Sequence, residues 1–222
     1  MIERPDNLTD LVFAAIRDRI VEASLPPGSS VSEATLAKEL TVSKTPVREA
    51  LLRLRRIGLV EPTSRGLRVT LPSVRTVRHA FEYRAVLESG AATYAAGHAS
   101  GEQLEAIVRW ASESLGCARA GDPADFRQTD HRFHLAVADA SGNEFLRSAI
   151  EDAFVLTMAL RRRDVSLVRD FVPDALEHLE IADALRTRNS AAASALVAGH
   201  ALRILDQLLD AMAKPGAVVP AG

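Results

Sequence analysis

Hydrophobic residues recur every three or four positions along most of the chain, the spacing of helices that bury one face. Near the N-terminus the pattern changes briefly, because apolar and polar residues alternate as they do in short strands. The expected elements are helices over 8–24 and 33–40, a third helix capped by Ser43 and stopped by Gly58, and strands over 59–62 and 67–71. Three helices followed by a β-hairpin predict a winged helix-turn-helix.

The rest of the chain keeps the helical spacing throughout. It predicts six helices, over 74–98, 101–120, 122–141, 144–163, 167–187 and 190–213, with breaks at glycines, prolines and Arg188-Asn189-Ser190. Pro72-Ser73 marks the boundary between the two parts. The expected fold class is mainly α: a winged helix-turn-helix over 1–72, an all-helical bundle over 73–214 and a frayed tail over 215–222.

Composition narrows the class of protein. Of 222 residues, 47% are hydrophobic, 25% charged and only 5% aromatic, which suits a globular chain rich in helix. No apolar run approaches the roughly 18–20 residues of a membrane span, and residues after Met1 contain no apolar signal core. The single cysteine, Cys117, cannot form an internal disulfide. We therefore expect a cytoplasmic protein with no membrane contact.

The charge is unevenly distributed. The net charge of the chain is −2, but residues 42–68 carry +5 and residues 73–222 carry −4. A small basic module joined to a larger acidic one predicts an anionic partner for the first module only. Double-stranded DNA is the expected partner.

The expected DNA-contacting residues lie at two places. The N-terminal end of the recognition helix enters the major groove in a helix-turn-helix, and the wing tip reaches the backbone or the minor groove. The residues are Ser43, Lys44, Thr45 and Arg48 in the helix, with Arg65 and Gly66 in the wing. The alternative is a solvated basic helix in a domain that does not bind DNA, against which stand the turn spacing, Pro46 in the first turn and the wing glycine.

Four residues of the acidic module form a candidate metal site. Asp130 and His134 are four apart and share a helix face. His178 and His200 have their midpoint at Asn189, in a predicted turn, so folding the two helices antiparallel brings both imidazoles to one height, about 16 Å from the turn. One carboxylate and three imidazoles suit a divalent ion such as zinc, nickel or manganese. The alternative is that each histidine is separately structural or exposed, as we expect for His79, His98 and His131.

The basic module resembles the GntR family of bacterial regulators. The resemblance covers about residues 8–71 and rests on residues 36–51, Leu54, Gly58-Leu59-Val60 and Arg65-Gly66. Family members usually have Arg where Lys44 stands. The resemblance implies a groove-reading winged helix.

The acidic module resembles the FCD effector-binding domain of the FadR subfamily, over nearly all of residues 74–210. The resembling stretches are 83–88, 130–134, 141–146, 177–178 and 199–200. The resemblance implies a helical bundle with a metal at its core and a small carboxylate effector beside it. It also implies that Arg84 binds the effector; the alternative for Arg84 is a salt bridge with Glu88, four residues on. Arg161, Arg162 and Arg163 could form a solvated helix end, an anion contact or a dimer surface, of which we favour the helix end.

These features together predict a ligand-responsive transcriptional regulator, a repressor, and not an enzyme. A homodimer would read a pseudo-palindromic operator with its two basic modules, and a small organic acid would change the DNA affinity. One alternative is a metal-dependent hydrolase, since Asp and three His can activate water. A second is a regulator for which the metal ion itself is the signal. A sensor of lipid derivatives fits the polar ligand set less well. The sequence leaves the effector, the metal and the operator unspecified.

Overall fold

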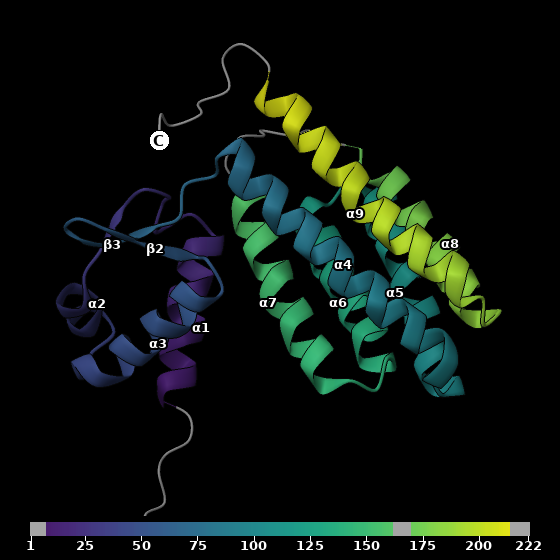
Figure 1. Ribbon diagram of the computed structural model, residues 1–222, viewed down its shortest axis with the longest axis horizontal. Coiled ribbons are helices and arrows are strands. Elements are labelled where there is room, and N and C mark those ends of the chain that lie inside the picture. The colour runs from purple at the N-terminus through teal and green to yellow at the C-terminus, as the bar shows by residue number, and fades with distance from the viewer. Residues whose placement is uncertain (1–7, 162–169, 214–222) are drawn as a thin grey trace, which may run out of the picture. The chain divides into compact units, whose positions relative to one another are not determined.

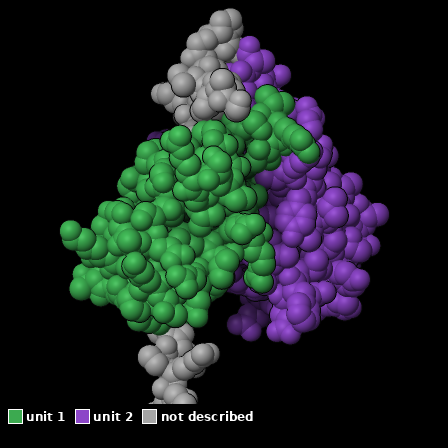
Figure 2. Space-filling model, turned by 60° about the vertical axis from the view of Figure 1, so that its left-hand side comes forward, with its two compact units in different colours: residues 1–77, 155–165, 214–222 green, residues 78–154, 166–213 purple. Residues whose placement is uncertain are grey.

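The computed structural model describes residues 8–161 and 170–213, which divide into two compact units (Figure 1, Figure 2). The first unit contains the chain up to Val77 together with a stretch that begins at Val155. The second contains residues 78–154 and the segment that ends at Ala213. The expected tail over 215–222, and Arg162 and Arg163, lie outside the described residues.

The first unit is a winged helix-turn-helix, as predicted. Its elements are α1 (Leu8–Val21), β1 (Ser30–Val31), α2 (Glu33–Glu39), α3 (Lys44–Arg56), β2 (Val60–Thr63) and β3 (Gly66–Val69). The strands form an antiparallel sheet in the order β1-β3-β2. The first helix is shorter than expected because Ala23, with φ 58°, leaves the helical region. The sequence pattern missed β1, since two residues are too few to alternate visibly.

Local side-chain chemistry sets the ends of these elements. Ser32 caps α2 by accepting a hydrogen bond from the Thr35 backbone N–H at 3.4 Å. Ser43 is the N-cap residue of α3, as predicted, and has the extended backbone conformation of that position, although its hydroxyl makes no capping hydrogen bond. At the wing tip Gly66 has φ +131°, a conformation that a side chain would strain.

The core of the first unit forms where α1, α3 and the sheet bury their apolar faces. Ile16, Val47 and Leu54 are fully buried there, and Val155 belongs to the same cluster. The buried positions of α3 are spaced three or four apart, so the opposite, basic face of α3 stays in solvent. The cationic side chains of α3 therefore lie on the surface of the unit.

The second unit is an all-helical bundle. Its helices are α4 (Val74–His98, which begins just before the unit boundary), α5 (Gly101–Ala120), α6 (Pro123–Ala140), α7 (Glu144–Arg161, of which the part from Val155 belongs to the first unit), α8 (Val172–Arg186) and α9 (Ser190–Met212). Five of these lie within two residues of the predicted bounds. The sixth, predicted over 167–187, begins only at Val172, because Pro173 occupies the first helical turn, where its missing N–H costs nothing.

Caps and turns fix how these helices follow one another. Ser100 and Gln103 form a reciprocal capping box at the start of α5. Gly121 ends the same helix with φ 70°, a left-handed conformation that glycine adopts without strain. In the turn between α8 and α9, the Arg188 guanidinium donates to the carbonyls of Ala96 and Ala99 at 3.1 and 2.6 Å. This turn is therefore tied to the end of α4.

The bundle packs α5 against α6 and α8, and α8 against α9. Its largest buried cluster draws on all of these helices and on α4, and is rich in alanine, which lets helix axes approach closely. Over residues 8–161 and 170–213, the structure contains no helix that is both long and apolar enough to cross a lipid bilayer.

We predict that Leu54→Ala lowers the free energy of unfolding by about 2–5 kcal/mol, because it leaves a cavity around a side chain with no exposed surface. Leu52 is the matched control: it lies on the same helix but is 59% exposed, and Leu52→Ala should change stability by less than about 0.5 kcal/mol. Urea titration followed by circular dichroism measures both. Equal losses would show that Leu54 does not anchor the core.

Candidate metal centre

The four predicted metal ligands converge in the core of the second unit. Asp130 and His134 come from α6, His178 from α8 and His200 from α9. One ligand atom from each lies within 4.8 Å of all the others, and all four side chains are buried. The imidazole centroids of His178 and His200 are 4.9 Å apart. The helical hairpin thus brings the two histidines to one height, as their equal distance from Asn189 predicts.

Each imidazole is held at its Nδ1 atom by a different neighbour. The Nδ1 of His134 lies 2.8 Å from Glu88 Oε2, and the Nδ1 of His200 lies 2.7 Å from Glu177 Oε2. The Nδ1 of His178 lies 3.0 Å from the Ser114 hydroxyl. Contacts of this kind fix the ring orientation of metal-binding histidines. All three rings therefore keep Nε2 for another partner.

These three Nε2 atoms are buried and, among the described residues, make no hydrogen bond. Leaving a buried polar atom without a hydrogen bond costs roughly 1–3 kcal/mol. A cation bound by all three Nε2 atoms would offset that cost. Asp130 Oδ1 lies 3.3 Å from the Nε2 of His178 and 3.5 Å from that of His134. Two ligands of a tetrahedral zinc ion, at about 2.0–2.2 Å each, lie roughly 3.4 Å apart, and only opposite ligands of a six-coordinate ion reach roughly 4.4 Å. The two contacts of Asp130 already have the first spacing, whereas the full set, within 4.8 Å, has to contract around a divalent ion.

Electrostatics favours an ionised carboxylate and mostly neutral imidazoles. Burial raises the pKa of Asp130, but its contacts with His134 and His178 outweigh this and hold the pKa well below the ordinary value. Burial lowers the pKa of His178, and that of His200 to about 4. For His134, burial also lowers the pKa, but the nearby carboxylates of Glu88 and Asp130 raise it by more, so the net pKa is raised. A metal that binds His134 would therefore displace a proton from it.

Arg84 forms the salt bridge that the sequence offered as an alternative to effector binding. Its Nε donates to Glu88 Oε1 at 2.5 Å, and its guanidinium lies 4.3 Å above the Phe154 ring. The side chain has no exposed surface, yet Nη1 and Nη2 make no hydrogen bond to any described residue. The salt bridge thus occupies one edge of the guanidinium and leaves the two terminal nitrogens for an anion.

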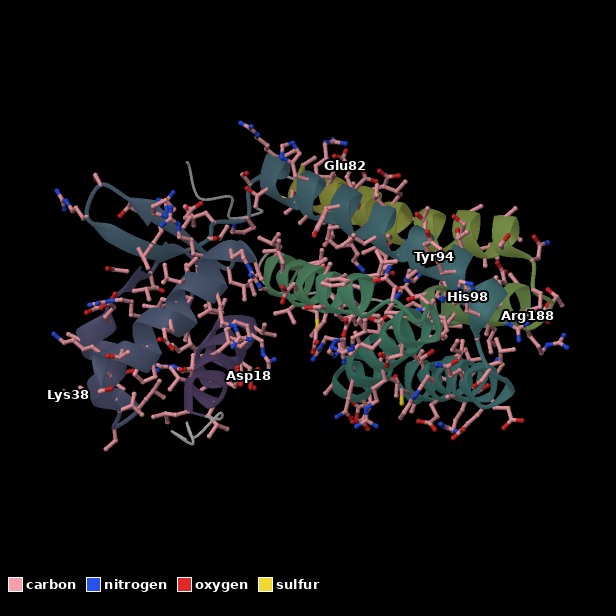
Figure 3. All side chains as sticks on the ribbon, turned by 60° about the horizontal axis from the view of Figure 1, so that its bottom comes forward. Asp18, Lys38, Glu82, Tyr94, His98 and Arg188 are labelled. Atoms are coloured by element: carbon pink, nitrogen blue, oxygen red, sulfur yellow. The ribbon has the colours of Figure 1, made fainter. Side chains whose placement is uncertain are left out.

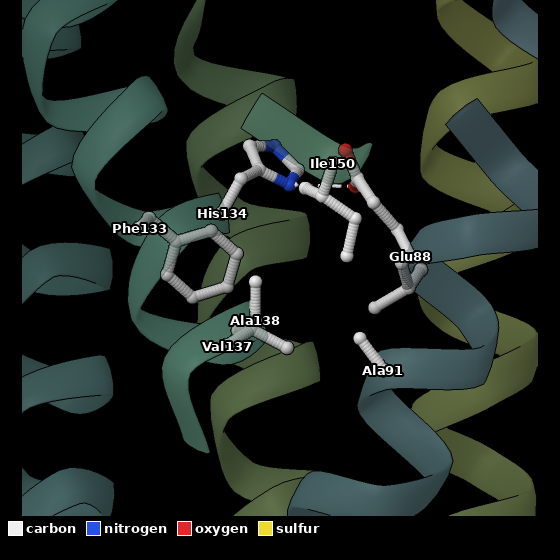
Figure 4. A pocket seen from close by; sticks show the side chains of 8 residues that line it. Glu88, Ala91, Phe133, His134, Val137, Ala138 and Ile150 are labelled. Carbon is white, nitrogen blue, oxygen red and sulfur yellow. Dashed lines mark ion pairs between the residues drawn. The ribbon is translucent and has the colours of Figure 1, made fainter. Parts of the chain in front are cut away.

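A small pocket borders the site (Figure 4). Glu88 and His134 form its polar side, while Ala91, Val137 and Ile150 are among its apolar lining residues. As it stands, the pocket is too small to hold a water molecule. A ligand entering from this side therefore has to displace side chains.

The predicted DNA-contacting residues lie on the exposed surface of the first unit. Ser43, Lys44, Thr45 and Arg48 stand at the N-terminal end of α3, and Arg65 and Gly66 at the wing tip. Arg48 is not idle, because its guanidinium forms a salt bridge with Glu33 at 3.1 Å. The Arg48 side chain is 64% exposed and that of Glu33 33%, and ion pairs near the surface contribute little to stability.

Comparison with known proteins identifies the fold and the class. Residues 8–66 match the family model of bacterial regulatory proteins of the gntR family, and residues 79–203 match the FCD domain. The chain is 31% identical to the HTH-type transcriptional regulator LutR of Bacillus subtilis, over 85% of this chain and 95% of that protein. It is 33% identical to the "Probable D-xylose utilization operon transcriptional repressor" of Paenarthrobacter nicotinovorans, over 78% of each.

The protein belongs to the GntR family. The solved structure of E. coli McbR/YncC shares the fold, with a TM-score of 0.77 and 20% identity over 95% of this chain and 99% of that one. Like its relatives, this GntR member is a DNA-binding transcriptional regulator with an FCD domain, and not an enzyme. The hydrolase alternative is therefore wrong.

Several residues around the FCD site escaped sequence analysis. Ser114 gives no signal, because one serine on a helix resembles any other. Glu177 and Arg203 did offer one, since Glu177 precedes His178 and Arg203 lies one helical turn after His200. In the structure, Arg203 binds Glu177 and also lies 2.7 Å from Asp174. This network connects α8 to α9 beside His200.

We predict an acid-sensitive metal-free protein. Between pH 6.5 and about 4, unfolded His200 binds a proton that the folded residue, with a pKa of about 4, does not bind, so stability falls as the pH falls. His178 acts in the same direction, while the raised pKa of His134 acts against it. Urea unfolding in chelator measures the effect.

The variant His200→Gln isolates this contribution and should lose less stability over that window than the parent protein. The matched control is His98→Gln, because His98 is exposed at the end of α4. It should keep the parental slope. An unchanged slope in His200→Gln would refute the assignment.

Proposed function

We propose that this GntR regulator is a repressor whose FCD domain binds a divalent metal ion at Asp130, His134, His178 and His200. The observation that carries the proposal is the convergence of three buried, unpartnered Nε2 atoms on one ionised carboxylate. Zinc, nickel and manganese all accept such a set. When bound, the ion supplies positive charge and open coordination positions, while this chain supplies the ligands and the residues that orient them.

We further propose that the effector is a small organic acid held by Arg84. The unpartnered Nη1 and Nη2 atoms offer the planar pair of donors that binds a carboxylate through two parallel hydrogen bonds. The bordering pocket is closed and Arg84 is not among its lining residues, so an acid that reaches Arg84 has to displace side chains and thereby selects or induces a second conformation. Such a ligand changes DNA affinity only if it binds the DNA-competent and the incompetent conformations differently.

For DNA, we propose that Lys44, Thr45 and Arg48 read base edges and that Ser43, Arg65 and Gly66 contact the backbone or the minor groove. The exposed positions of all six support this assignment. The repressor sign is supported by relatives that are named as repressors. A regulator that answers to the metal alone is the remaining alternative, and it requires no organic ligand.

The test is a fluorescence-anisotropy titration of the metal-loaded protein with its own upstream DNA. We expect one sequence-selective site, and weaker binding when small carboxylic acids are added. Binding that shows no sequence preference at moderate salt would refute the proposal. Binding that responds to the ion but to no acid would favour the metal-sensor alternative.

The same titration on His178→Ala separates the two units. The variant loses an FCD ligand but no residue of the winged helix, so it should contain less metal and lose the response to acid while its operator affinity stays close to parental. Elemental analysis measures the metal content. An unchanged metal-to-protein ratio would contradict the assignment of His178.

We also propose that two copies associate through the exposed face of α4 (Figure 3). Tyr83, Val86 and Tyr94 are 51%, 71% and 51% exposed on this face, and Gly90 and Gly97 have open space beside them. The face carries no charged group between Tyr83 and Gly97, because the charged residues of that stretch, Arg84 and Glu88, are buried. The three side chains leave on the order of 300 Å² exposed, a substantial part of the roughly 800 Å² that each partner buries in a stable complex.

Val86→Glu should shift the protein toward monomer in sedimentation velocity, because it buries a charge at the centre of that contact. Operator affinity should fall with it, since two half-sites need two modules. Val74→Glu is the control, as Val74 is 47% exposed on α4 but lies outside the stripe. A monomeric parent protein, or an equal effect of both variants, would refute this surface.

A further inference from the structure

Glu88 is a buried carboxylate that contacts two functional groups at once, His134 (Figure 4) and Arg84. Its Oε1 atom lies 2.5 Å from Arg84 Nε, and its Oε2 atom lies 2.8 Å from His134 Nδ1. Arg84 and Glu88 are one helical turn apart on α4, while His134 is on α6. A single side chain therefore joins the candidate anion anchor to a candidate metal ligand.

Both of its partners keep an unused face. His134 has a buried Nε2 atom, and Arg84 has buried Nη1 and Nη2 atoms, that make no hydrogen bond within the described part of the chain. These are the atoms that would meet a cation and an anion, respectively. Glu88 contacts Arg84 at Nε and His134 at Nδ1, the atoms opposite those that would bind the two ligands. Binding at either residue can therefore alter its contact with Glu88.

We infer that Glu88 is a positioning residue that couples the two sites, so that neutralising the charge of Arg84 strengthens metal binding. This inference rests on the proposed metal and carboxylate binding. Glu88 strengthens His134 as a ligand by drawing its Nδ1 proton, as carboxylates behind metal-bound histidines do. Arg84 binds the same carboxylate, which reduces the negative charge that Glu88 presents to His134 and so weakens His134 as a ligand. An anion bound to Arg84 neutralises its charge and restores that effect of Glu88.

The buried charges point in the same direction. With His134 neutral, as it is when it binds a metal, Arg84, Glu88 and Asp130 sum to −1, and a divalent ion raises the total to +1. A ligand carboxylate with one negative charge then brings the buried cluster to zero, whereas without the ion it would bring the cluster to −2. Uncompensated charge is costly in a core that excludes water. By linkage, if the anion favours the metal, the metal favours the anion by the same factor.

The test needs only Zn²⁺ as its probe, measured by competition with a chromophoric chelator. Glu88→Gln should weaken Zn²⁺ binding about tenfold or more. Arg84→Gln, which removes the charge but keeps a hydrogen-bond donor, should tighten it about fivefold or more. Combined with Glu88→Gln, the Arg84→Gln change should shift the affinity by less than about twofold. Glu82→Gln is the matched control, because Glu82 is exposed on the same helix (Figure 3), and it should leave the affinity unchanged.

Equal effects of Arg84→Gln in both backgrounds would overturn the role of Glu88 and leave the metal site intact. A parent protein that bound none of zinc, nickel and manganese would overturn the proposed function itself. If Arg84→Gln does not fold, the parent protein decides: the NMR signal of Arg84 Nε–H should move when Zn²⁺ binds. A signal that stays in place with the ion bound would overturn the inference.

Discussion

Desolvation of three imidazoles is the constraint on which the second unit depends. His134, His178 and His200 are taken out of water. Their Nδ1 atoms contact Glu88, Ser114 and Glu177, while their Nε2 atoms make no hydrogen bond to a described residue and two of them face Asp130 at 3.3 and 3.5 Å. Removing water strengthens every charge interaction that remains. The same core that makes these rings costly to bury would therefore also strengthen their interaction with a divalent cation.

Much of this arrangement was readable from the sequence, because helical periodicity and turn residues fix where ligands stand along a helix. The four-residue spacing of Asp130 and His134, and the symmetry of His178 and His200 about Asn189, predict that these four side chains meet, and in the bundle they do. The sequence alone could not decide whether Arg84 binds an effector or forms a salt bridge with Glu88. Spacing places Glu88 within reach of Arg84, but only the structure shows that His134 shares the same carboxylate.

The misses have a common physical cause. Ser114 acts through a contact between α5 and α8, and such a contact leaves no periodic trace in one chain. The two-residue strand β1 pairs with β3 through backbone hydrogen bonds rather than through a distinctive sequence. In the winged helix, the exposed positions followed from periodicity, whereas the salt bridge between Arg48 and Glu33 joins α3 to α2 and depends on how those helices pack.

The closed pocket beside Glu88 has a kinetic consequence. A space that cannot admit one water molecule fills only while neighbouring side chains are transiently displaced. For the proposed effector, the rate of binding at high concentration would then be limited by the rate at which the bundle opens, and no longer by the rate of collision. Such binding would follow sustained changes in effector concentration and not brief ones.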